Sequence, residues 1–498
     1  MGKEQADQDT IRFAETKLIC EENLPIKDEA KRHAAELAIL GVRLLMDFEP
    51  VRKAPSQNME EVLVERNMRI AYSVPKHRHY MRSGYSSEPI LAEAAANLMR
   101  TLRTTEVRGE DCPDDRIAEI LRRHAENGLV GKGEMGELTG RLLLILAMDL
   151  AQEAAQSTEG AKGIGPRWSK PVSVIDFIKS LIGSDNYDKH VKNSLPDNSS
   201  GEAFHQRFRN SVVRFTHFAR SDDDSGVTTA AAYAAFVRGL AVQCHPFQQS
   251  VDVAVPMLID RSGPVEEKNM TILLISFKNR SRSLNVVNTA INVRQLGCFP
   301  DADPMEGDTE AMRPYISLVM ELGVQTQVPS GPASAASRNC PTTSGTLKRS
   351  TDTSAAPPRK KPKTGPSLPP SAQAKIDSNM RAVRKPPKRG KRQPVNPHYR
   401  IRIRGCSPKV YGVVHNEDVY AHLLHTRPIF TEHARLDDDF LAAVRRLKPF
   451  FSEGLDGHGH WLHFPNHITK TIENAVTVDM IETGKPADED SETEGSAE

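Results

Sequence analysis

Asp252 and Lys278 are the residues in this sequence whose types and spacing first suggest chemistry. They lie at the outer ends of two apolar runs, Val251–Ile259 and Thr271–Phe277. The runs are separated by a polar stretch in which Ser262-Gly263-Pro264 interrupts regular structure, so the pattern predicts a β-hairpin with a long loop. If the pairing is centred near residue 265, Asp252 faces Lys278. We therefore expect an acid and a base to meet at one end of a buried ladder.

Ser276 lies two residues before Lys278, so the two side chains share a face of the second strand. That face can also carry Asp252. A third group comes from the segment Lys132–Gln156, which is strongly apolar on one side and predicts a long helix. Glu137 and Arg141 stand near its start at helical spacing.

Two carboxylates and a lysine close together are the groups that metal-assisted cleavage of a phosphodiester requires. Carboxylate oxygens are the hard ligands that Mg²⁺ prefers. The metal stabilises charge on a scissile phosphate and lowers the pKa of bound water, while an ammonium group orients the water or the phosphate. In this interpretation Asp252 and Glu137 are the metal ligands and Lys278 is the positioning cation.

Each of these residues also has a structural interpretation. Asp252 could be a turn residue or the partner of a nearby arginine. Glu137 and Arg141 could form a surface ion pair worth a few tenths of a kcal/mol. Lys278 begins the basic cluster KNRSR, which continues with Arg280 and Arg282 and could contact phosphate.

The arrangement resembles the PD-(D/E)xK core of restriction-endonuclease-like nucleases. In that family an Asp opens one strand of a hairpin, a D/E-x-K triplet closes the next, and a preceding helix often adds an acid. The matching positions here are Val251-Asp252, Ser276-Phe277-Lys278 and Glu137. The resemblance implies an α/β (α+β) fold, a mixed sheet flanked by helices, and Mg²⁺-dependent cleavage. Ser276 departs from the pattern, because a hydroxyl is a neutral and weak metal ligand.

Further segments, including GYSSEPILAEAAANLM, GELTGRLLLILAMD and AAYAAFVRGLAVQC, resemble a large set of uncharacterised basidiomycete fungal proteins. Their cores are similar to nuclease-like modules that stand beside a P-loop NTPase in Crinkler-type and retrotransposon-hot-spot-type proteins. The phosphate-binding pattern G-x-x-x-x-G-K-[ST] does not occur in this sequence. The resemblance implies that the chain corresponds to the nuclease-like part alone.

Charge is strongly segregated along the 498 residues, although Lys+Arg 66 and Asp+Glu 65 nearly cancel. Residues 325–398 hold 15 Lys/Arg, 2 Asp/Glu and 13 of the 33 prolines, without Phe, Trp or Tyr, which predicts a disordered basic insert. Residues 481–498 are rich in Asp and Glu, which predicts a disordered acidic tail. We also expect residues 1–26 to be disordered. Residues 27–324 hold a helical region and the nuclease-like core with the hairpin at 250–280, and they should form one domain with residues 399–480. Strands 315–324 and 399–405 could then be neighbours in one sheet.

Two clusters in the insert, PPRKKPK (357–363) and RKPPKRGKR (384–392), predict a nuclear-import signal that an import receptor would bind, although a solvated linker would have a similar composition. The residues of this signal are Arg359, Lys360, Lys361, Lys363, Lys388, Arg389, Lys391 and Arg392.

Six cysteines without C-x-x-C spacing indicate a reducing compartment, and no apolar run is long enough to cross a bilayer. The histidines of DGHGHWLHFPNH (His458, His460, His463 and His467) lack Cys or acidic partners at fixed spacing, so we expect no zinc site.

The sequence thus favours a nuclear, metal-dependent DNA nuclease. A nuclease-like protein that binds nucleic acid or protein without cleaving, and a mobile-element passenger without retained activity, remain as alternatives.

Overall fold

The computed structural model describes residues 2–48, 55–74, 76, 81–104, 115–126, 134–158, 168–222, 227–245, 251–279, 293, 298–299, 312–323, 325–327, 396–424, 475–477 and 480–483. All of them belong to one compact unit, Met1–Val328 with Val395–Glu498. The described residues form a mixed α/β structure, as expected. None of the helices they form is both long enough and apolar enough to cross a membrane.

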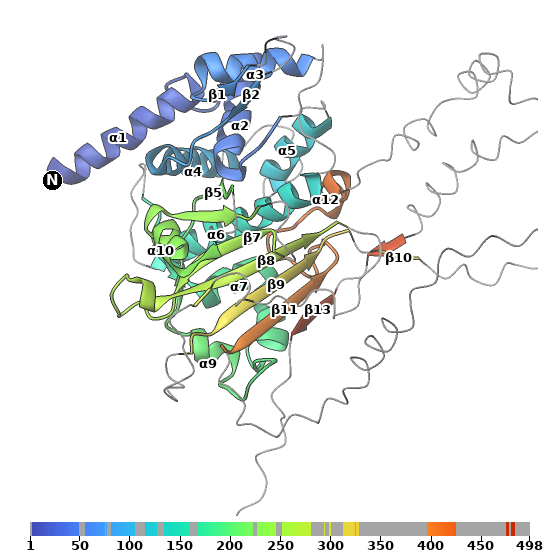
Figure 1. The fold of residues 1–498 in the computed structure, drawn as a ribbon. Helices are drawn as coiled ribbons and strands as arrows, with labels where there is room; N and C mark the ends of the chain where they lie inside the picture. The colour runs from blue at the N-terminus through green and yellow to red at the C-terminus, as the bar shows by residue number, and fades with distance from the viewer. Residues whose placement is uncertain are drawn as a thin grey trace, which may run out of the picture. The chain divides into compact units, whose positions relative to one another are not determined.

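A curled mixed sheet of nine strands forms the centre of this unit (Figure 1). Its main path runs in the order β13-β11-β9-β8-β7-β4-β3, and β6 and β5 join it through β7. The strands are β3 (Val172–Ser173), β4 (Val212–Val213), β5 (His217–Arg220), β6 (Leu240–Gln243), β7 (Val253–Leu258), β8 (Met270–Lys278), β9 (Tyr315–Glu321), β11 (His398–Arg404) and β13 (Met480–Thr483). Two smaller sheets pair β1 (Ile70–Ser73) with β2 (Arg82–Gly84), and β10 (Gln325–Gln327) with β12 (Ala475–Thr477).

Helices flank the sheet, and α1 to α4 lie together near β5 (Figure 1). The helices are α1 (Gly2–Ile19), α2 (Glu29–Leu44), α3 (Pro55–Arg66), α4 (Pro89–Thr104), α5 (Arg116–Glu126), α6 (Met135–Thr158), α7 (Val174–Ile182), α8 (Ser184–Asn186), α9 (Phe204–Phe208), α10 (Thr229–Arg238) and α12 (Glu417–Leu424). A π-helical turn spans Tyr187–Val191 and a 3₁₀ turn spans Glu267–Asn269.

The central strands are buried on both faces, which explains why β7 and β8 read as continuous apolar runs. Along β8, Leu273 and Ile275 belong to the core cluster that contains the side chains of α6 and α7. Ile272 and Leu274 point the other way, into a second cluster built around α10. The sheet therefore lies between two apolar layers, and its strand ends are the places where polar side chains can gather.

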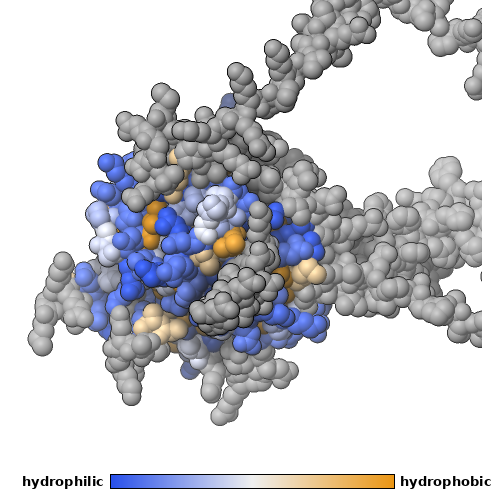
Figure 2. Space-filling view, turned by 90° about the horizontal axis from the view of Figure 1, so that it is seen from below, coloured by the Kyte–Doolittle hydropathy of each residue, from blue (hydrophilic) through white to orange (hydrophobic). Residues whose placement is uncertain are grey.

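The outer surface is polar where it can be seen from below (Figure 2). On that face the described residues are mostly hydrophilic, and the apolar ones lie in separate small groups. They form no continuous apolar patch on the visible described part of this face.

The β8, β9 and β11 strands run parallel side by side, with Ile275 beside Leu318 and Leu318 beside Ile401. The predicted pairing of strands 315–324 and 399–405 is therefore confirmed. Residues 328–395, which make up most of the predicted insert, lie outside the described residues. At its ends, Gln325–Gln327 forms β10 and His398 already belongs to β11.

The expectation of disorder at the two ends of the chain was wrong in part. Residues 2–19 form α1, because Ile11, Leu18 and Ile19 recur at helical spacing and are buried, and the helix packs on α4. The first residues of the predicted acidic tail, 481–483, belong to β13 instead. There Ile481 is buried and pairs with Ile403 of β11.

Three short segments complete the description. Residues 209–218 contain β4 and the start of β5, and helix α10 ends at Arg238, shortly before β6. Residues 410–414 belong to no helix or strand.

Candidate active site

The hairpin that the sequence predicted is present as β7 and β8, but its register differs from the expected one. Val253 pairs with Ile275, and the backbone N–H of Asp252 donates to the carbonyl of Ile275 at 2.9 Å. Asp252 therefore lies beside Ile275 and Ser276, and the prediction that it stands opposite Lys278 was wrong. The Lys278 side chain is long enough to reach back, so the acid and the base still meet.

Three donors converge on one oxygen of Asp252. Its Oδ2 accepts hydrogen bonds from the Phe277 backbone N–H at 2.6 Å, the Ser276 hydroxyl at 3.2 Å and Lys278 Nζ at 3.2 Å. Among the described residues, Oδ1 makes no hydrogen bond. The side chains of Asp252 and Lys278 are 24% and 20% exposed, so this end of the hairpin remains accessible to solvent.

Glu137 is brought to this strand end by the close packing of α6 on β8. Gly136 and Gly140 lie one turn apart on the helix, and a Cβ on either would overlap the side chain of Asn279 or Phe277. The two glycines therefore let the helix backbone approach the end of β8. Glu137, the residue after Gly136, is half-buried beside the hairpin.

The charges around Glu137 show that it shares the environment of the hairpin acid. Burial is the largest cause that raises the pKa of Glu137, and the negative charge of Asp252 raises it further. The cations of Arg141, Lys278 and Arg220 act in the opposite direction. The structure thus brings Asp252, Lys278 and Glu137 together at one end of the central strands β7 and β8.

Gln243 and the role of Arg141 were missed from the sequence. Arg141 Nη1 donates to Gln243 Oε1 at 2.9 Å and to the Leu45 carbonyl at 3.3 Å. Gln243 Nε2 in turn lies 3.5 Å from Glu137 Oε2. Gln243 stands at the end of β6, the strand beside β7, and only the pairing of these strands reveals its position.

Arg141 is not the surface partner of Glu137 that helical spacing suggested. It is 1% exposed, and among the described residues its guanidinium donates to the Gln243 amide and the Leu45 carbonyl and to no carboxylate. Burial lowers the pKa of Arg141 to about 10, so the group remains a cation at neutral pH. A buried cation therefore lies beneath Glu137.

The donor set suits one class of metal ion. Within the described parts of the chain, no three His, Cys, Asp or Glu side chains are arranged to hold a metal. Asp252 and Glu137 offer two carboxylates, which fits Mg²⁺, because this ion usually keeps several waters and binds one or two carboxylates together with a substrate phosphate.

Glu321, which lies beside Lys278 in the sheet, is a poor additional ligand. Its Oε2 accepts from Arg402 Nε at 2.9 Å, and Arg404 Nε lies 3.5 Å away.

The other predicted functional residues lie outside the described residues. These are Arg280 and Arg282, the eight residues of the import signal, and the histidines of 458–467. Lys278 is therefore the one predicted nucleic-acid contact whose position the structure describes.

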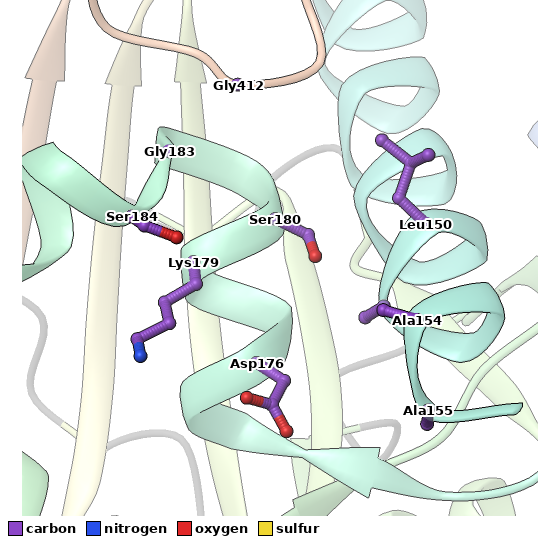
Figure 3. Close-up of a pocket in the computed structure, with 10 residues that line it drawn as sticks. Leu150, Ala154, Ala155, Asp176, Lys179, Ser180, Gly183, Ser184 and Gly412 are labelled. Atoms are coloured by element: carbon purple, nitrogen blue, oxygen red, sulfur yellow. The ribbon is translucent and has the colours of Figure 1, made fainter. Parts of the chain in front are cut away.

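A separate hollow of about 470 Å³ lies between α6 and α7 (Figure 3). It is lined by small residues such as Ala154 and Gly412, with Asp176 and Lys179 on α7. Its first residue on α6, Leu150, is 13 positions after Glu137, or about 20 Å along the helix. The hollow is thus remote from the candidate active site.

No family model matches this chain, and comparison with curated proteins and with solved structures found no match either. The nuclease resemblance of the sequence therefore has no support from a relative.

Proposed function

We propose that this protein is a metal-dependent phosphodiesterase that cleaves nucleic acid, with DNA as its first substrate to test. One observation carries the proposal: Asp252, Lys278 and Glu137, from the residue before β7, the end of β8 and helix α6, meet at one end of these central strands. A purely structural ion pair between Asp252 and Lys278 would not account for a second, half-buried carboxylate close enough for Asp252 to raise its pKa.

The chain's own groups would divide the work as follows. Bound Mg²⁺ would supply Lewis-acid stabilisation of the phosphate charge and a water of lowered pKa. Asp252 would present Oδ1 as a ligand while three donors hold Oδ2, so its orientation is fixed before binding. Glu137 would supply the second carboxylate. Lys278, on the same side of the hairpin, would donate to the attacking water or to a phosphate oxygen.

The flanking basic residues fit the same proposal. Arg280 and Arg282 lie two and four positions after Lys278 and would contact the phosphate backbone. The clusters at 357–363 and 384–392 would bring the protein to the nucleus through an import receptor and add attraction to DNA. We thus place the proposed activity in the nucleus.

A nuclease-like protein that binds without cleaving is the second candidate, and Ser276 favours it. The serine is 2% exposed and its hydroxyl donates to Asp252, at the position where the nuclease pattern has an acid. The site then has one carboxylate fewer than the family pattern. Binding of this kind would fall steeply with salt and would need neither a metal nor the Asp252 carboxylate.

Cleavage of supercoiled and linear DNA with Mg²⁺ or Mn²⁺ tests the proposal. Wild type is compared with Asp252→Asn and Lys278→Met, which keep side-chain size and remove the charge. Asp260→Asn and Lys268→Met are matched controls, because both residues lie in the loop at the far end of the same hairpin.

Metal-dependent nicking that both site variants lose and both controls keep would support the nuclease. Nicking that survives in Asp252→Asn would refute the assigned site. If wild type binds DNA without cutting it, and Asp252→Asn binds equally well, the binding function replaces the catalytic one.

A further inference from the structure

Gln243 lies between the buried guanidinium of Arg141 and the carboxylate of Glu137, and these two partners determine which way its amide group faces. The guanidinium of Arg141 has only donors, so the Gln243 atom 2.9 Å from it must be the carbonyl oxygen. The amide NH₂ group then faces Glu137, with Nε2 at 3.5 Å from Oε2. Because Arg141 holds the Gln243 carbonyl oxygen, the NH₂ group of Gln243 is the one that faces Glu137.

Arg141 is itself held in place by the fold. It reaches the carbonyl of Leu45, which caps the C-terminus of α2, where helix carbonyls lack partners and the helix dipole favours a cation. The guanidinium thus joins α2, α6 and β6, and its Nε finds no hydrogen-bond partner within the part of the chain that the structure describes. Gln243 is half-buried and its backbone pairs with Val253, the residue after Asp252. The backbone of Gln243 therefore lies next to the strand of Asp252, while its amide reaches toward Glu137.

We propose that Gln243 is a positioning residue of the metal site, which holds the Glu137 carboxylate toward Asp252 in an orientation set by Arg141. This inference rests on the proposed phosphodiesterase function. Hydrogen-bond partners of metal ligands typically affect metal affinity 10–100-fold when they are removed. Because the contact between Gln243 and Glu137 is long, we expect the lower end of this range, about tenfold.

Binding of Mn²⁺ alone to the full-length protein, followed by the electron paramagnetic resonance signal of the free ion, tests the inference without any cleavage. The variant is Gln243→Met, which keeps the length of the side chain and removes the amide. Gln152→Met is the matched control, since Gln152 is a buried glutamine whose amide donates to the Lys170 carbonyl, far from the site in the last part of α6. The Mn²⁺ binding that Asp252→Asn loses is the part that belongs to the candidate site. Thermal unfolding verifies that each variant is folded.

A double-mutant cycle separates positioning from a general structural role. If Gln243 acts through Glu137, Gln243→Met should weaken Mn²⁺ binding about tenfold in wild type and have no further effect in a Glu137→Gln background. Gln152→Met should leave the affinity unchanged.

Two results would overturn the inference while the proposed function stands: unchanged affinity in Gln243→Met, or the same loss in the Glu137→Gln background. Absence of any Mn²⁺ binding that depends on Asp252 would instead refute the metal site itself, and with it the role of Gln243.

Discussion

Replacing Ser276 with aspartate should make the stability of the protein depend on metal. Ser276 Oγ lies 3.2 Å from Asp252 Oδ2, so a carboxylate there would stand about 4 Å from that of Asp252. At this separation two like charges repel by about 4 kcal/mol at an effective dielectric constant of 20. Lys278, which already pairs with Asp252 at 3.2 Å, would also attract the new carboxylate, and this added attraction offsets about half of the repulsion. Without metal we therefore expect a loss of about 2 kcal/mol, equivalent to about 4–8 °C in Tm.

A divalent cation should reverse this loss, because the variant restores the acid that the nuclease pattern contains. A ligand at 100 times its Kd stabilises a folded protein by about 2.7 kcal/mol. Thermal unfolding at pH 8, in a chelator and in Mg²⁺ or Mn²⁺, measures both effects. Ser276→Asn is the matched control, since it has the size of aspartate without its charge and should respond to metal no more than wild type.

The reasoning fails if Ser276→Asp is as stable as Ser276→Asn in the chelator, since the two carboxylates would then not be close. It also fails if metal raises the Tm of both variants equally. A selective gain of stability in Ser276→Asp, accompanied by nicking that exceeds that of wild type, would instead identify Ser276 as the residue that limits the metal site.

Two further substitutions test the packing and the electrostatics of the fold. Gly140→Ala should destabilise the protein by about 1–3 kcal/mol and weaken Mn²⁺ binding, because its Cβ would overlap the Phe277 ring and move α6 from β8; chemical denaturation at wild-type stability would contradict this. His217→Gln should flatten the acid side of the stability profile. Burial first, and then Arg43 and Arg238, lower the pKa of His217 to about 3, so the unfolded chain takes up its proton first as the pH falls below about 6.5. The wild type therefore loses stability as the pH decreases, by about 2 kcal/mol at pH 5. Urea unfolding at pH 7 and pH 5 measures this loss. The explanation is refuted if the urea midpoint falls by the same amount in His217→Gln as in the wild type.

Apolar patterning predicted the main elements around the site because most residues of those elements are buried. The runs that became β7 and β8, the strands β9 and β11, and the long helix of Glu137 all carry continuous or periodic apolar residues. In such segments the spacing of apolar residues shows which positions are buried, and this spacing predicts whether the segment is a helix or a strand. The α1 helix shows the limit, since three buried residues among polar ones did not distinguish it from a disordered end.

The details of the site depended on contacts that residue types do not encode. The register differs because the hairpin is centred on residue 264, as the pairs Val253–Ile275 and Leu258–Met270 show, and the extent of two apolar runs does not fix that centre to within one residue. Helical spacing paired Glu137 with Arg141, whereas the tertiary structure directs Arg141 to Gln243 and to the end of α2. Gln243 gave no signal at all, since only the pairing of β6 with β7 places it beside the acids.

The parallel pairing of β9 with β11 has a consequence for biosynthesis. Between these neighbouring strands the ribosome must add 76 residues, from 322 to 397, which takes about 4–15 seconds at 5–20 residues per second. Throughout that interval the seven residues of β9, all buried in the finished protein, present an unpaired strand edge. Such an edge is a template for association with other nascent chains. Chains that terminate within this interval should therefore require chaperones to stay monomeric, although the residues of the candidate active site have already been synthesised.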